Sequence, residues 1–240
     1  MLDDLYTANA EWYAALVASW QDELDAGVSA LLGPITGDVV DIASGVGTGL
    51  PVLRTLGAER LFAVEPSASM RVGLMTTIAA DPDLLRRTTV VPAPLPEALE
   101  ALPTRWGAAV MLNALGHLDD ATRVGLWRAA AERLSPGGRL VISLQPPESV
   151  TAIPWTDFGA VRIGQQHLTT RGKAETLNDT HVQWTMEWTL HAADGRVVDL
   201  RTAEHSWRVL GREYLREEAG EHGLIAIDDG PDSFLAFERP

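Results

Sequence analysis

The stretch Val39-Val40-Asp41-Ile42-Ala43-Ser44-Gly45-Val46-Gly47-Thr48-Gly49 decides the fold of this chain. A short apolar run contains an acid near its end, three glycines follow at alternate positions, and a helical pattern begins after them. Glycine is needed where φ must be positive or where a ligand must approach the backbone closely. The stretch therefore predicts a strand that feeds a tight, ligand-approached turn.

A second acid, Glu65, ends the next apolar run, Leu61–Val64. A carboxylate at the end of that strand can hold both hydroxyls of a ribose. Together with the glycine-rich turn, it predicts a cofactor that contains a nucleoside.

Length and composition set broad limits on the protein. The chain has 240 residues and is 46% hydrophobic, which suits one globular domain with a full core and room for a subdomain. No apolar run approaches the roughly 20 residues that span a bilayer, and the acidic N-terminus lacks the basic start of a signal peptide. We therefore expect a cytoplasmic protein without membrane partners. The absence of cysteine excludes disulfides, Cys-ligated zinc and a cysteine nucleophile.

The formal net charge of -14 bears on partners. Nucleic acid binding relies on Lys and Arg that neutralise phosphates, so no nucleic acid partner is expected. A cationic substrate such as an amine would be attracted. The commoner reading of such a charge is that it keeps the protein soluble.

The order of the expected elements predicts the fold class. Residues 2–32 read as a helix, because Trp12, Leu16 and Trp20 repeat at helical spacing. From 38 to 145, short apolar strands alternate with helices, which predicts an α/β fold with a Rossmann-like, doubly wound, mostly parallel sheet. Its ligand site is expected at the C-terminal strand ends.

After residue 145 the pattern changes. Three prolines make 146–160 read as a crossing loop, and residues 182–191 alternate apolar with polar, which is typical of a half-buried strand. Asp194-Gly195 marks a hairpin turn, so we expect an antiparallel β insertion near the C-terminus. The expected parts are an N-terminal helical cap (1–37), a cofactor-binding core (38–145), an antiparallel substrate or dimer subdomain (146–210), and a C-terminal helix and strand pair that complete the core sheet (211–240).

Asp41 separates two classes of nucleoside cofactor. NAD carries a pyrophosphate, which favours helix N-terminal amides and no nearby anion. S-adenosylmethionine (SAM) instead carries a cationic amine, which an acid beside the turn can hold by charge-assisted hydrogen bonding. Asp41 therefore favours SAM, and an NAD-binding oxidoreductase remains the less favoured alternative.

Four pieces in order resemble class I SAM-dependent methyltransferases. They are Asp41-Ile42-Ala43-Ser44-Gly45-Val46-Gly47-Thr48-Gly49, Ala63-Val64-Glu65-Pro66-Ser67-Ala68-Ser69-Met70, Asn113-Ala114-Leu115-Gly116-His117-Leu118 and Leu134-Ser135-Pro136-Gly137-Gly138-Arg139-Leu140. The opening Leu5-Tyr6 … Ala10-Glu11-Trp12-Tyr13 resembles the tyrosine-bearing helix of small-molecule N-methyltransferases, including those that act on amino sugars.

The resemblance implies a role for each matching residue. Ala43, Gly45 and Gly47 would line the methionine part, Asp41 would reach its amine, and Glu65 would hold the ribose. Met70 would lie against adenine, Pro94 and Leu95 near its edge, and Asn113 would offer a carbonyl to the amine. The chain departs from the family at Ala43, where glycine is usual, and lacks the acid often found after the third strand. A SAM-binding protein that does not methylate, such as a cyclase or a binding partner, therefore stays open.

Catalytic and substrate residues are expected at the same edge of the sheet. An amine must lose a proton during methyl transfer, and His117, with an ordinary pKa near 6.5, is the best candidate base. Tyr13 could offer a hydroxyl, and Tyr6, Trp184 and Trp188 could wall the substrate pocket. Simpler readings are helix entry for His117, helix packing for the tyrosines, and the inner face of a sheet for the tryptophans.

The sequence thus predicts SAM-dependent N-methylation of a small-molecule or peptide amine in natural-product biosynthesis. O-methylation of a natural-product hydroxyl is the nearest rival. No metal is expected, because an N-cap explains Asp119 better than a ligand cluster does. Exposed edges of the added sheet favour a homodimer.

Overall fold

A seven-stranded sheet forms the centre of the molecule, in the order β10-β11-β5-β4-β1-β2-β3. The computed structural model describes residues 6–227 and 229–240. The strands are β1 (Asp38–Ile42), β2 (Arg60–Val64), β3 (Thr88–Val91), β4 (Trp106–Met111), β5 (Leu134–Ser143), β10 (Ile225–Ile227) and β11 (Phe234–Glu238). Strands β1 to β5 run parallel, while β11 is antiparallel to both β5 and β10. The predicted fold class is confirmed.

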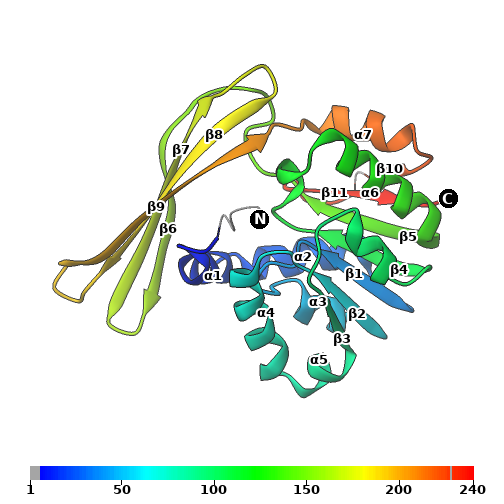
Figure 1. Ribbon diagram of the computed structural model, residues 1–240, viewed down its shortest axis with the longest axis horizontal. Helices are drawn as coiled ribbons and strands as arrows, with labels where there is room; N and C mark the ends of the chain where they lie inside the picture. The colour runs from blue at the N-terminus through cyan, green and yellow to red at the C-terminus, as the bar shows by residue number, and fades with distance from the viewer. Residues whose placement is uncertain (1–5, 228) are drawn as a thin grey trace.

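Helices cover both faces of this sheet (Figure 1). One face carries α6 (Asp120–Arg133), α7 (Arg212–Gly220) and the short η1 (Glu97–Ala101), and the other carries α2 (Gln21–Leu32), α3 (Leu50–Thr55), α4 (Ala68–Ala80) and α5 (Pro82–Arg87). Since both faces are covered, the parallel strands are almost continuously apolar, which is why they are easy to recognise in the sequence. The predicted N-cap of α6 is confirmed, because the Asp119 carboxylate accepts a hydrogen bond from the Thr122 amide.

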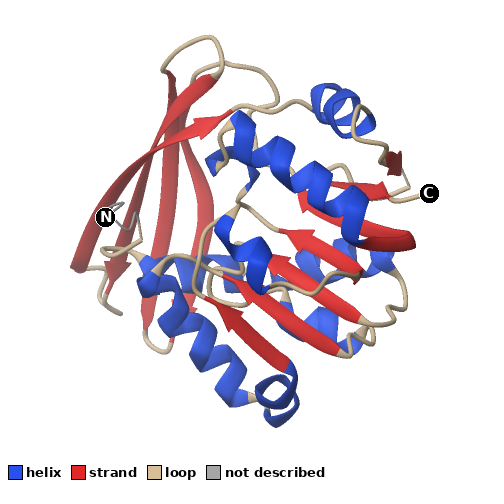
Figure 2. Cartoon of the chain, turned by 45° about the vertical axis from the view of Figure 1, so that its right-hand side comes forward, coloured by secondary structure: helices blue, strands red, loops and turns tan. Residues whose placement is uncertain are grey.

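A second, antiparallel sheet of four long strands stands beside the central one (Figure 2). It consists of β6 (Ile153–Ile163), β7 (Gln166–Thr176), β8 (His181–His191) and β9 (Val197–Arg208), in sequence order. Along β8, Val182, Trp184, Trp188 and Leu190 are buried, as the period of two predicts. The predicted antiparallel insertion is therefore present.

The expected loop at 146–160 is wrong over its second half, which belongs to β6. Pro154 misled the prediction, because proline is rare inside sheets. Here β6 is an edge strand, and its pairing register shifts between Ile153 and Thr156, so Pro154 sits at an irregularity where no ladder bond is lost.

The expected single helix over residues 2–32 is also wrong. The chain forms α1 (Ala10–Ala18) and then α2, with a turn at Ser19 and Trp20 between them. The two helices serve different partners, because Trp12 and Ala15 of α1 pack against the four-stranded sheet, whereas α2 packs on the central sheet. Residues 1–5 of the expected cap lie outside the described residues. Within the described part of the chain, no helix combines the length and apolarity needed to cross a membrane.

Candidate functional site

The turn after β1 lies at the point where the strand order reverses between β1 and β4, which is where open α/β sheets bind their ligands. Asp41 is 1% exposed there, and a Cβ added to Gly49 would lie 3.3 Å from its Oδ2. The third glycine of the turn therefore lets the chain pass directly over the carboxylate. Among the described residues, Asp41 Oδ2 has no hydrogen-bond partner. Burial, and secondarily the charge of Glu65, raises the pKa of Asp41 to about 7.

Backbone geometry explains the other glycines of the turn. Gly45 and Gly47 have φ values of +57° and +85°, in the left-handed region that favours glycine. Ala43 adopts φ +55° in the same turn, although its Cβ disfavours that conformation by roughly 1–2 kcal/mol. The departure at Ala43 thus changes the residue and keeps the backbone shape.

Glu65 joins this turn to the next one. It follows β2 directly and accepts hydrogen bonds from the amides of Gly45 and Ser67, both at 2.7 Å. A carboxylate presents about four acceptor positions, and these two bonds fix its orientation at the strand end. The predicted ribose acid is thus held beside the predicted methionine loop.

Asn113 follows β4 with φ +56° and is held by Ser143 at the end of β5. The Ser143 hydroxyl accepts from the Asn113 amide at 2.6 Å and donates to its side-chain oxygen at 2.9 Å. Sequence reasoning missed Ser143. Its position at the end of a neighbouring parallel strand was the available signal, since such ends meet at one edge of the sheet.

The three residues predicted near adenine do not line the two cavities around the loop. Met70 is buried in a cluster with Val17 and Val46, so it packs beneath α1. Pro94 is exposed and Leu95 is half-buried against the core of the α6 face. The structure therefore puts Met70 next to the glycine-rich loop and leaves Pro94 and Leu95 on the segment after β3.

A cavity of about 320 Å³ opens between α1, the strand ends and the inner face of β8 and β9. Tyr13 and Asn113 line both this cavity and the small pocket over the glycine-rich loop. They form the junction between the two. The predicted substrate residues Tyr6, Trp184 and Trp188 all line the cavity.

His117 lies in the short helix η2 (Leu115–His117) and lines the same cavity. Its Nε2 is 3.2 Å from the Tyr6 hydroxyl, and its ring centroid is 5.5 Å from that of His205. Burial, and then the proximity of His205, lowers the pKa of His117 to about 4. The expected pKa near 6.5 is therefore wrong: the imidazole is neutral at neutral pH, but it holds a proton weakly.

The Tyr13 hydroxyl, unlike the His117 imidazole, holds its proton tightly. Burial, and secondarily the charge of Glu65, raises the pKa of Tyr13 to about 12. Tyr13 therefore keeps its proton, and its chemistry at the junction is that of a hydrogen-bond donor.

Several cavity residues were missed or underrated by sequence reasoning. Phe158 comes from β6, where a loop was expected, and Asn9 precedes α1 with no pattern to mark it. His205 and Trp207 also line the cavity from β9, where His205 is paired directly with Trp184 of the neighbouring strand β8. Trp207 also packs on Gly116, where an added Cβ would lie 2.2 Å from the indole.

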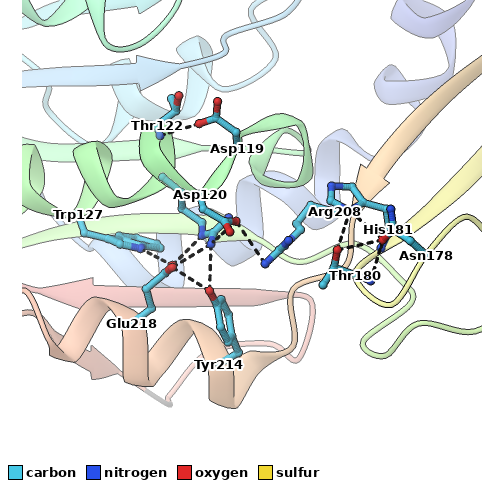
Figure 3. Close-up of polar contacts among 11 residues, drawn as sticks. Asp119, Asp120, Thr122, Trp127, Asn178, Thr180, His181, Arg208, Tyr214 and Glu218 are labelled. Atoms are coloured by element: carbon cyan, nitrogen blue, oxygen red, sulfur yellow. Dashed lines mark hydrogen bonds and ion pairs between the residues drawn. The ribbon is translucent and has the colours of Figure 1, made fainter.

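A polar network fixes the end of β9 that carries Trp207 (Figure 3). Arg208 pairs with Asp120 at 3.2 Å, and Asp120 pairs with the buried Arg123 at 3.1 Å. Arg123 in turn binds Glu218 of α7 at 2.7 Å. The acids after His117 are thus occupied as a helix cap and as an ion pair, and no group of three or more His, Asp or Glu suited to a metal occurs within the described ranges.

The loop pocket fits the cofactor that the sequence favours. The unpartnered, buried oxygen of Asp41 would gain a donor and a counter-charge from the amine of SAM, whereas the phosphates of NAD would bring it a second anion. The residues present therefore suit SAM.

Comparison with known proteins agrees with this chemistry. Residues 17–224 match the family model described as "Methyltransferase domain". No curated protein matches this chain significantly.

Many solved structures share the fold, and three of them illustrate the likeness. The CcbJ methyltransferase from Streptomyces caelestis is 19% identical, with a TM-score of 0.63 over 92% of this chain and 90% of that one. SAM-bound CalS10, an amino pentose methyltransferase from Micromonospora echinaspora, is 15% identical, with a TM-score of 0.62 over 95% and 92%. The glycopeptide N-methyltransferase MtfA, bound to S-adenosylhomocysteine, is 22% identical, with a TM-score of 0.58 over 92% and 87%. The family match over most of the chain, on a fold with this loop, shows that the protein belongs to the methyltransferase domain family and is a class I SAM-dependent methyltransferase.

Proposed function

We propose that this enzyme transfers the methyl group of SAM to an amine nitrogen of a small molecule or peptide in natural-product biosynthesis. One observation carries the proposal: an aromatic cavity that is bordered by Glu23 and contains the neutral His117 meets the cofactor loop at Tyr13 and Asn113. Aromatic faces and carboxylates attract cations, as an amine requires. The structural likeness to an amino pentose methyltransferase and a glycopeptide N-methyltransferase is consistent with an amine acceptor.

The proposed roles follow the geometry. Bound SAM supplies an electrophilic methyl group on a cationic sulfur. Asp41, Ala43, Gly45 and Gly47 hold its methionine part, and Glu65 holds its ribose. By resemblance to the family, Met70, Pro94 and Leu95, which line neither cavity, would lie on the adenine side of the loop, and Asn113 would offer its carbonyl to the amine.

On the acceptor side, Tyr6, Trp184 and Trp188 hold the body of the substrate. Tyr13 donates a hydrogen bond from its hydroxyl at the junction and so orients the reactants. Correct orientation is the main requirement of an in-line displacement. His117 accepts the proton of the attacking amine. Because the pKa of His117 is low, the imidazolium releases that proton to the solvent through the open cavity and does not store it.

His117→Ala tests the base. We expect kcat to fall about 10²-fold, while the Kd of S-adenosylhomocysteine changes by less than about twofold, since His117 does not line the loop pocket. Because the wild-type imidazole is neutral above its pKa of about 4, the ratio of wild-type to variant kcat should stay constant from about pH 5.5 to 8. A ratio that changes with a midpoint near 6.5 would show a normally titrating base.

Product analysis tests the acceptor atom. A library of amines and hydroxylated aromatics is incubated with the enzyme and SAM, and each product is analysed by mass spectrometry and NMR. We expect the new methyl group on nitrogen, with one S-adenosylhomocysteine formed per methyl. Exclusively O-linked methyl would favour the hydroxyl alternative, and turnover without S-adenosylhomocysteine would favour a protein that binds SAM without methylating.

A further inference from the structure

The acceptor cavity is bordered by acids and by no base. Glu23 and Glu204 border it, and among the described lining residues there is no Lys or Arg. Glu204 pairs with Thr185 on the face of β9 opposite Trp184 and His205, so its carboxylate lies on the outer face of the sheet, and Glu23 supplies the carboxylate on the cavity side. The remaining polar groups are neutral, and they include the buried Asn9 Oδ1 and Trp188 Nε1, which have no hydrogen-bond partner among the described residues. The cavity therefore offers a carboxylate, aromatic faces and neutral hydrogen-bonding groups.

The arginines nearest in sequence to lining residues are engaged elsewhere. Arg201 pairs with Glu11 and Asp199 and donates to the carbonyl of residue 8. Arg208 pairs with Asp120. A third arginine, Arg212, donates to the carbonyls of residues 232 and 234. Each guanidinium would have to break these contacts to reach a ligand in the cavity.

The two histidines of the cavity do not supply the positive charge that the arginines withhold from it. His117 and His205 are both largely buried, and their rings lie 5.5 Å apart, so a proton on one disfavours a proton on the other. Both therefore remain neutral where the enzyme would work.

An anionic group on the acceptor would meet an unfavourable environment. A carboxylate or phosphate loses its water on entry and needs a cationic partner to compensate. Here it would find the Glu23 carboxylate and the negative faces of aromatic rings instead. A cationic or neutral amine meets the reverse situation, since both kinds of group attract it.

We infer that the acceptor is an amine whose part inside the cavity carries no anionic group and packs on the aromatic wall that Trp184, Trp188 and Trp207 form. Phosphorylated amines and free amino acids, whose anion would enter the cavity with the amine, are excluded as acceptors. This inference rests on the proposed amine methylation and narrows it to one substrate class.

Matched pairs of probes test the inference without methyl transfer. Calorimetry on the protein loaded with S-adenosylhomocysteine measures the Kd of tryptamine against tryptophan, and of glucosamine against glucosamine 6-phosphate. Each pair differs by one anionic group. We expect the amine without the anion to bind at least about tenfold more tightly in at least one pair, and the anionic member to be favoured in neither.

A charge-reversal variant provides the second measurement. Glu23→Lys places a cation at the edge of the cavity, so the ratio of the two Kd values should fall at least about fivefold. Glu100→Lys makes the same change in charge on the exposed surface of η1, outside the cavity, and should leave the ratio unchanged.

Three results would overturn the inference: anionic members that bind as tightly as their partners, a Kd ratio that Glu23→Lys leaves unchanged, or no binding by either amine that lacks an anion. None of these depends on which atom is methylated. A failure of the amine proposal would appear separately, as O-linked methyl in the product analysis.

Discussion

At the scale of single residues, Asp41 is the most unusual group in the molecule. It is buried at the end of β1, one of its oxygens has no hydrogen-bond partner among the described residues, and its pKa is raised to about 7. Without a cation beside it, much of its population at neutral pH is protonated. The amine of SAM would supply that cation, so cofactor binding must be linked to the release of a proton.

This linkage predicts how the affinity for SAM depends on pH. Below pH 7 the Asp41 carboxyl must ionise before it can pair with the amine, so the affinity should fall, by at most about tenfold for each pH unit. Asp41→Asn should weaken binding by about 10- to 100-fold at pH 8 and remove this dependence. Calorimetry at pH 6, 7 and 8, in buffers that differ in ionisation enthalpy, measures both the affinity and the protons released.

Asp38→Asn is the matched control, because Asp38 begins the same strand but pairs with the exposed Arg60, away from the site. It should leave the pH dependence intact. If the affinity in Asp41→Asn keeps the wild-type pH dependence, the proton belongs to another group.

Some properties of single site residues could be predicted from the sequence, and others could not. Asp41, Glu65 and Asn113 were predictable because each ends a parallel strand, and such ends share one edge of the sheet. The low pKa of His117 was not, because it depends on burial and on His205, which is far away in sequence. Asn9 carries no pattern that would mark it.

At the scale of elements, burial decided which strands could be predicted. Strands β1, β2 and β4 and the second half of β5 are buried on both faces, so continuous apolar runs mark them, whereas the edge strand β3 is only partly buried. Strand β7 points Leu168, Thr170, Gly172 and Ala174 inward, and three of these four are small or polar, so its alternation is hidden. Strand β6 is an exposed edge with a proline, which reads as a loop.

The contact between α6 and α7 shows a pairing that sequence reasoning could not find. Glu218 accepts hydrogen bonds from Arg123, Trp127 and Tyr214, and the Arg123 side chain is fully buried. Arg123 and Glu218 are 95 residues apart. No local pattern links them.

Glu218→Gln should destabilise the protein by about 3 kcal/mol, because it leaves the buried guanidinium without its carboxylate partner on α7. Asp120 cannot take over, since its side chain is 63% exposed. Urea unfolding measures the change. Glu217→Gln, at the exposed neighbouring position, should change stability by less than about 0.5 kcal/mol, and equal effects of the two substitutions would contradict a structural role for the pair.

At the scale of the whole molecule, the site places three groups with abnormal pKa values below pH 8 in the region between the two sheets. Asp41 belongs to the central sheet, His205 to the four-stranded one, and His117 lies between them. In the folded state the pKa of each histidine is lowered to about 4 and that of Asp41 is raised to about 7. Global stability must therefore depend on pH through all three groups.

The histidines and Asp41 change the free energy of unfolding in opposite directions as the pH falls. The unfolded histidines, with pKa values near 6.5, bind more protons than the folded ones between about pH 4 and 6.5, so each histidine makes stability fall as the pH falls, by at most about 1.4 kcal/mol per pH unit. Asp41 has the reverse sign, because the folded state holds the extra proton between about pH 4 and 7. Two histidines against one acid leave a net loss of stability on acidification.

Urea unfolding at pH 7, 6 and 5 tests this sum. These values stay above the range in which the depressed carboxyl pKa values of Asp81, Asp119 and Glu218 would contribute. We expect the wild-type midpoint to fall from pH 7 to pH 5. In the double variant His117→Asn/His205→Asn only the Asp41 contribution remains, so its midpoint should rise over the same range. If the two proteins change in parallel, the histidines titrate normally, and the cavity is wetter and less apolar than its aromatic walls imply.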